Sequence, residues 1–69
     1  MAVAKAVDLV GSGATIEGAI SEAIDRAIGT LEAVTDFKVR KISGEVEDSG
    51  VTYRVKVRVW FTLLERMHG

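Results

Sequence analysis

The stretch TYRVKVRVWF, residues 52–61, decides how this chain folds, because apolar and polar side chains alternate along it. Alternation with a period of two is typical of a β-strand, whose side chains point to opposite faces of a sheet. One face carries the apolar side chains Tyr53, Val55, Val57, Val59 and Phe61. The other carries three cations and an indole, on Arg54, Lys56, Arg58 and Trp60. The stretch therefore predicts a strand with one face for a core and a cationic face whose role needs an explanation.

The length of the chain bounds the size of that core. The 69 residues include no cysteine, which predicts a single domain, residues 1–69, without disulfides to reinforce it. A core in a chain this short supplies only a few kcal/mol, and association of subunits is a common source of further burial. The hydrophobic fraction of 48% is high for such a chain. We therefore expect subunits that cover apolar surface against one another.

Charge and hydropathy limit the kinds of binding partner and the cellular compartment that we expect for this chain. A net charge of -1 gives no global attraction to nucleic acid. No apolar run approaches the roughly 20 residues that span a bilayer. The segment at residues 1–10 contains Lys5 and Asp8 and does not resemble a signal peptide. Absence of cysteine fits a reducing compartment. We expect a cytoplasmic protein with no membrane partner.

The first half of the chain predicts a strand followed by a helix. Residues 2–10 are rich in Val and Ala and predict a strand, and the GSG at residues 11–13 predicts a turn. Thr15 is the expected helix N-cap, with Glu17 at the positive end of the helix dipole. Apolar residues then recur at steps of three and four, as in an amphipathic helix: Ile16, Ala19, Ile20, Ala23, Ile24, Ala27, Ile28, Leu31 and Val34.

The second half predicts a long hairpin. From Asp36 the period returns to two, but Ile42 falls out of phase, which predicts a bulge near Arg40 and Lys41. The EDSG at residues 47–50 supplies the turn. The order strand, helix and hairpin predicts an α+β fold of β-α-β-β order with a three-stranded antiparallel sheet.

One helix can cover only one face of such a sheet. We expect the isoleucine stripe of the helix to meet the apolar face of the hairpin, formed by Phe37, Val39, Val55, Val57, Val59 and Phe61. The cationic face is then left uncovered. A bare sheet face with open edges favours association unless another function uses it.

The chain offers little for covalent or metal chemistry. Its one histidine is His68, and it has no cysteine, so a nucleophile beside an oriented base is not expected. The GSG at residues 11–13 lacks the Lys and Ser or Thr of a phosphate-binding loop, and no ligand set has metal-site spacing. We expect a protein that is not an enzyme, with no catalytic residue and no metal site.

Three motifs together resemble the dodecin family over nearly the whole chain. They are DLVG at residues 8–11, AIDRA at residues 23–27 and the alternating final strand TYRVKVRVWFTL at residues 52–63. The resemblance implies a three-stranded antiparallel sheet partly wrapped around one helix. It also implies a homododecamer, a hollow shell with helices outside and sheets inside, in which flavins are stored between subunits without turnover.

Two positions depart from the flavin-binding pattern of that family. Flavin-binding members place a tryptophan just before the FxV of the second strand, where the indole stacks on the flavin, and this chain has Asp36 there. They also place a flavin-contacting glutamine after the aromatic of the last strand, where Arg54 follows Tyr53 here. Lost stacking and the desolvation of a carboxylate argue against the usual site. FMN, FAD and riboflavin are the cofactors the resemblance implies, and the sequence leaves the ligand open.

The two departures form the basis of a further hypothesis. Asp36 and Arg54 are expected to form an ion pair across neighbouring strands or between subunits, which would fill the former pocket with protein. Trp60 stands where the family usually has a small residue. It lies about 20 Å along the strand from Arg54, so we expect it at a subunit contact and not as a replacement indole within its own subunit.

Three functions remain open. The first is a dodecin-like shell that binds a flavin or another anionic ligand through Asp36, Arg54, Lys56, Arg58 and Trp60. The second is a dodecin-like assembly whose pocket is closed by Asp36 and Arg54 and whose role is structural or unknown. The third is binding of single-stranded nucleic acid through cations and aromatics. The third has the least support, because Trp60 is the sole aromatic expected on the cationic face.

Overall fold

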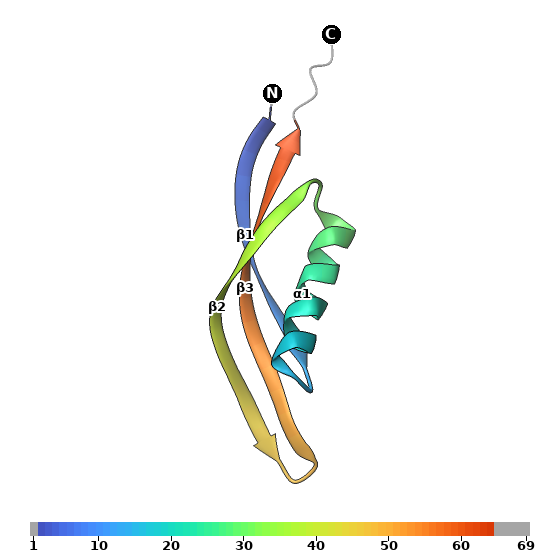
Figure 1. Cartoon of the computed structure of the whole chain (residues 1–69), viewed down its shortest axis with the longest axis vertical. Helices are drawn as coiled ribbons and strands as arrows, with labels where there is room; N and C mark the ends of the chain where they lie inside the picture. Colours follow the sequence, from blue (N-terminus) through green and yellow to red (C-terminus); the bar gives the residue numbers. More distant parts are fainter. Residues whose placement is uncertain (1, 65–69) are drawn as a thin grey trace.

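The computed structural model of the chain describes residues 2–64, so His68 and the rest of residues 65–69 lie outside the described residues. The elements are β1 (Ala2–Gly13), α1 (Ile16–Thr30), β2 (Val34–Glu47) and β3 (Gly50–Leu64) (Figure 1). This is the predicted β-α-β-β order of an α+β fold. The molecule is elongated, with principal extents of 60 × 18 × 13 Å, and the strands reach beyond both ends of α1 (Figure 1).

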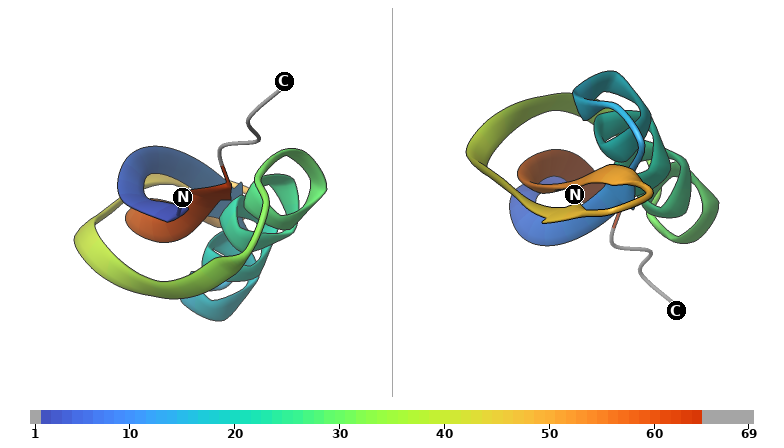
Figure 2. Two further views of the ribbon diagram at one scale, coloured as in Figure 1. Left: turned by 90° about the horizontal axis from the view of Figure 1, so that it is seen from above. Right: turned by 90° about the horizontal axis from the view of Figure 1, so that it is seen from below.

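The three strands form one antiparallel sheet with the order β1-β3-β2. β3, which contains the TYRVKVRVWF stretch, is therefore the central strand and pairs on both sides. Viewed along the long axis, the strands curve strongly and α1 lies on one side of them (Figure 2). The opposite face of β3 is covered by no helix of the described chain.

The core beneath α1 is made by alanines of the helix and valines of β3. The fully buried side chains are Ala19, Ala23, Ala27, Val55, Val57 and Val59. The expected contact between the isoleucine stripe and the apolar face of the hairpin is correct only in part, because Ile28 is 61% exposed and Phe37 is 49% exposed. Ile20 and Ile24 pack only at the margin of this core. A row of small side chains every fourth residue lets the helix backbone approach the sheet more closely than isoleucines would.

Gly11 makes this close approach possible. A Cβ built on Gly11 would lie 2.0 Å from the carbonyl oxygen of Ala19 and 2.9 Å from the backbone nitrogen of Ala23. Gly11 and Gly13 both belong to β1, so their prediction as turn glycines is wrong. Gly11 is instead the position at which a strand and a helix touch backbone to backbone, which only a residue without a side chain permits.

The beginning of the helix is as predicted. Thr15 is the N-cap, and its Oγ1 accepts a hydrogen bond of 2.9 Å from the backbone N–H of Gly18. Glu17 lies in the first turn, where a carboxylate is favoured by the helix dipole. At the other end, the N–H of Leu31 donates to the carbonyl of Ala27 at 2.7 Å.

Two bulges interrupt the pairing of β2 with β3. The register shifts between Val39 and Lys41, which confirms the predicted bulge, and also between Val34 and Asp36, which the sequence did not indicate. Each shift exchanges the face on which the following β2 side chains lie. As a result Lys41 lies opposite Lys56, while Ile42 moves to the helix side, opposite Val55. The hairpin turn is as predicted, with Glu47 opposite Gly50.

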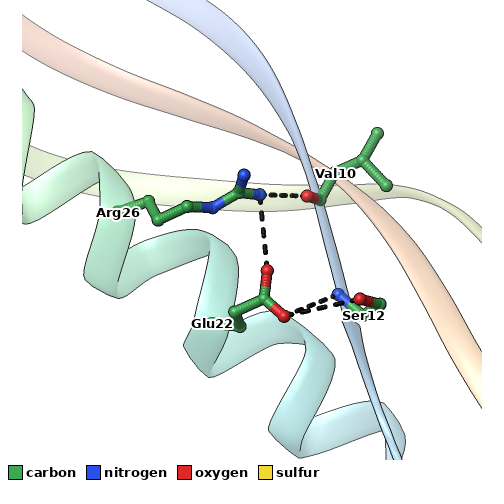
Figure 3. A network of polar contacts seen from close by, with 4 residues as sticks. All are labelled: Val10, Ser12, Glu22 and Arg26. Carbon is green, nitrogen blue, oxygen red and sulfur yellow. Dashed lines mark hydrogen bonds and ion pairs between the residues drawn. The ribbon is translucent and has the colours of Figure 1, made fainter.

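Side chains of α1 also cover part of the free edge of β1 (Figure 3). Ser12 donates its backbone N–H to Glu22 Oε2 at 3.2 Å, and the Arg26 guanidinium donates to the carbonyl oxygen of Val10. Glu22 and Arg26 are themselves paired at 3.6 Å across one helical turn. Since β1 is an edge strand with unpaired backbone groups, these contacts occupy positions at which another strand would bind.

Candidate functional site

The face of the sheet away from α1, here called the helix-free face, is organised in rows across the three strands. Partners directly opposite each other on neighbouring strands share a face. The rows follow from the register and read, from β1 through β3 to β2: Ala6–Trp60–Asp36, Asp8–Arg58–Lys38, Val10–Lys56–Lys41 and Ser12–Arg54–Ser43. The predicted site residues Asp36, Arg54, Lys56, Arg58 and Trp60 therefore share one face but lie in four different rows.

The first row places the indole beside the carboxylate. Asp36 is the direct partner of Trp60, whereas Arg54 lies opposite Ser43. An Asp36–Arg54 pair across neighbouring strands is therefore wrong, because six residues along β3 separate the two rows by about 20 Å. The sequence suggested that Trp60 lies far from position 36, where the stacking tryptophan is missing, and the register shows that this prediction is wrong. Trp60 is the cross-strand neighbour of position 36 within its own subunit.

Asp36 is held at the edge of this row by its neighbour. Thr35, the extra residue in the first β2 bulge, donates from its hydroxyl to Asp36 Oδ1 at 2.7 Å. Trp60 is half-buried, while Asp36 is exposed. On the β1 side the row ends in Ala6, whose side chain stops at Cβ. The row thus offers an aromatic surface with a hydrogen-bond acceptor on one flank and a small residue on the other.

The second row contains an ion pair that the sequence did not predict. Arg58 donates from Nε to Asp8 Oδ1 at 2.8 Å and from Nη2 to Asp8 Oδ2 at 3.1 Å. The hydrogen bond from Arg58 is the main cause that lowers the pKa of Asp8; desolvation opposes it, and the charges of Arg58, Lys56 and Arg40 lower the pKa further. The same hydrogen bond raises the pKa of Arg58. Two parallel hydrogen bonds hold the guanidinium, so Arg58 acts first as a link between β1 and β3.

The third row places two lysines face to face. Lys41 and Lys56 are direct partners across β2 and β3, and Val10 completes the row on β1. No ion pair joins either lysine to a carboxylate in the described part of the chain. Directly opposed like charges destabilise a sheet. This row is thus an electrostatic cost within the isolated chain.

The fourth row borders a pocket. Arg54 Nη2 lies 3.1 Å from Glu45 Oε1, but the two side chains are 59% and 55% exposed, and such pairs contribute little to stability. A cavity of about 200 Å³ opens here, lined by Val10, Lys41, Ser43, Arg54 and Lys56. Lys41 and Ser43 were missed as site residues because the bulge moves them to this face. The out-of-phase Ile42 was the signal that could have found them.

Other kinds of site are not formed by the described residues. Within residues 2–64, no three side chains of His, Cys, Asp or Glu come together in a way that could hold a metal ion. Among the same residues, no helix has the length and apolarity that crossing a membrane requires.

The fold and the helix-free face define a class of small α+β protein in which one helix covers a single face of a three-stranded antiparallel sheet. The sequence profile of the Dodecin family matches residues 3–64. The chain therefore belongs to the dodecin family. No curated protein matches the chain at the level of sequence.

Solved dodecin structures superimpose closely on this chain. An arginine-to-alanine mutant of Thermus thermophilus dodecin is 38% identical with a TM-score of 0.88, covering 96% of this chain and 100% of that one. Dodecin from Streptomyces davaonensis is 29% identical with a TM-score of 0.85, covering 93% and 97%. The calcium dodecin of Mycobacterium tuberculosis, a calcium-chelating antigen with a novel calcium-binding site, is 28% identical with a TM-score of 0.80, covering 97% and 99%.

Proposed function

We propose that this dodecin is a non-catalytic protein that binds a small aromatic, anionic molecule on the helix-free face of its sheet. The observation that carries the proposal is the row of Trp60 and Asp36 beside rows of cations, on a face that no helix of residues 2–64 covers. Membership of the dodecin family supports the same use.

The proposal includes self-association into a homododecamer whose helix-free faces meet in the interior. Large apolar side chains remain exposed on both faces of the sheet in the single chain. Val10 lies on the helix-free face and is 50% exposed, while Phe37 and Val46, on the helix side, are 49% and 85% exposed. Association would bury these side chains, and a domain of this size gains from such burial. The number of twelve copies comes from the family resemblance.

Flavins are the first ligands to test. Trp60 supplies an indole next to position 36, so the loss of a tryptophan at 36 does not remove the aromatic surface from this row. Stacking on an indole contributes about 0.5–1.5 kcal/mol beyond buried area. Asp36 adds an acceptor for ring N–H groups. The register excludes an Asp36–Arg54 pair within one subunit, and a pair between subunits remains the alternative proposal.

The test is a titration of riboflavin with the protein, followed by flavin fluorescence. We expect saturable quenching in the wild type, loss of quenching in Trp60→Ala and retention of most binding in Trp60→Phe, which keeps an aromatic ring. Circular dichroism and a sizing column check that each variant is folded and assembled. An unchanged flavin signal at micromolar wild-type protein would remove flavins as ligands, and equal binding by Trp60→Ala would remove the indole from the site.

A further inference from the structure

We propose that Glu22 and Arg26 of α1, here called the edge clamp, close the outer edge of β1 to strand addition by a second copy of the chain. The Glu22 carboxylate and the Arg26 guanidinium both bind the backbone of β1 at that edge (Figure 3). The inference goes beyond the proposed function, because it concerns the edge of the sheet and holds whether or not the helix-free face binds a ligand.

The first argument is that β1 lacks the protection of the opposite edge. β1 pairs with β3 in one unbroken register over its 12 residues, and among the described residues no strand lies on its other side. A long edge strand without a bulge is a template on which another chain can pair. On the opposite edge, β2 is interrupted by two register shifts and carries Lys38 and Lys41. Bulges and lysines are common ways of blocking an edge.

The second argument is where the edge clamp lies along β1. The first part of the strand carries the charged side chains of Lys5 and Asp8, whereas the last four residues, VGSG at residues 10–13, carry no charge. Two of these four are glycines, which have no side chain to hinder an incoming strand. The edge clamp contacts Val10 and Ser12, within this least protected part of the edge.

The third argument is that the edge clamp occupies the groups that an added strand requires. Arg26 donates to the carbonyl oxygen of Val10, and Glu22 accepts from the N–H of Ser12. In a parallel ladder, one residue of the neighbouring strand would bind the same carbonyl and the same N–H, and an antiparallel strand would also need both. The two side chains therefore take the place of one residue of a strand that faces Gly11.

The spacing of helix and strand explains why two side chains suffice. Val10 and Ser12 are two residues apart, about 6.6 Å along a strand, and Glu22 and Arg26 are four residues apart, about 6 Å along a helix. The ion pair between Glu22 Oε1 and Arg26, at 3.6 Å, leaves Glu22 Oε2 to accept from the Ser12 N–H at 3.2 Å. The side chains are 45% and 54% exposed, so the ion pair alone contributes little stability. Its consequence is that both side chains are aligned on the edge.

The experiment follows refolding of the full chain by dilution from urea, during which single subunits are present before they associate. Thioflavin T fluorescence reports added strands, and light scattering on a sizing column reports mass. The test variant is Glu22→Ala with Arg26→Ala, which leaves the net charge at -1. Asp25→Ala, in the same helix, removes one negative charge and controls for charge. Thr15→Ala weakens α1 through its N-cap but keeps the edge clamp, and so controls for a loosened helix.

We expect the double variant to form thioflavin-positive aggregates about tenfold faster than wild type or more, because a hydrogen bond to a charged group corresponds to at least that factor. Both controls should refold as wild type does. Glu22→Gln with Arg26→Lys, which keeps an acceptor and a donor, should stay close to wild type. Adding Ser12→Pro to the double variant should slow aggregation again, because it removes the edge N–H without restoring the edge clamp.

Refolding of the double variant at the wild-type rate and to the wild-type mass would overturn the edge clamp. Aggregation of Thr15→Ala or Asp25→Ala at the rate of the double variant would overturn it as well, as would a Ser12→Pro variant that folds and aggregates no more slowly. Circular dichroism shows whether each variant folds. If the double variant does not fold, Glu22→Ala alone, which frees only the Ser12 N–H, is compared with Thr15→Ala in the same way. These outcomes do not depend on riboflavin binding, so the proposed function is tested separately.

Discussion

Replacing Gly11 with alanine tests the close contact between β1 and α1. The new Cβ would lie 2.0 Å from the Ala19 carbonyl oxygen, and ordinary contact begins near 3.4 Å. The helix must therefore move away by about 1.4 Å, or the strand must bend, because both contacts are backbone. A gap of 0.5–1 Å already removes about a quarter to a half of the dispersion energy between facing atoms.

The cost follows from what this movement disrupts. The alanine row packs directly on Val55, Val57 and Val59, the largest fully buried side chains of the described chain. Overpacking typically costs about 1–3 kcal/mol, and we expect about 3 kcal/mol because the clash is with backbone. For a domain of this size that corresponds to a fall in Tm of about 12–24 °C.

The assay is thermal and urea unfolding followed by circular dichroism, at one protein concentration because association shifts apparent stability. Gly29→Ala is the matched control: nothing lies within 4 Å of its new Cβ, and it sits in α1. It should raise stability by up to about 1 kcal/mol. Equal stability of Gly11→Ala and wild type would refute the backbone contact.

Three further changes have outcomes fixed by the structure. Thr15→Ala removes the acceptor of the Gly18 N–H and should lower the free energy of unfolding by about 1 kcal/mol in urea; Thr15→Ser should not. Asp8 has its pKa lowered from 3.8 by Arg58, so its contribution is present above that value and lost as pH falls through the lower folded pKa. The stability difference between wild type and Asp8→Asn should thus be largest at neutral pH and vanish in acid, and a constant difference would contradict the ion pair. Lys41→Gln relieves the repulsion with Lys56 and should stabilise the ligand-free protein by about 0.2–1 kcal/mol in unfolding experiments; destabilisation would show that the two charges do not meet.

The sequence predicted most of the architecture, because periodicity reports which face a side chain takes. The period of two in residues 52–61 identified β3, and the capping residue Thr15 identified the beginning of α1. The out-of-phase Ile42 identified the second bulge of β2. These signals are local, because each depends only on residues that are close together in the sequence.

What the sequence did not reveal depends on register between distant strands. Nothing in the chain says that Asp36 pairs with Trp60 and not with Arg54, or that Asp8 meets Arg58. The choice of alanines over isoleucines for the helix contact depends on Gly11, which looks like a turn residue until the helix is placed on it. The pocket lined by Lys41, Ser43, Arg54 and Lys56 could not be predicted, because its position depends on the strand register and on the bulge in β2 together.

The central claim is that the helix-free face is an interior surface, covered by other copies of the same chain. Light scattering on a sizing column measures this most directly. The account predicts a mass near twelve times the 7.4 kDa of one chain. A folded species of 7.4 kDa at every concentration, with its Trp60 and lysine rows facing water, would contradict it.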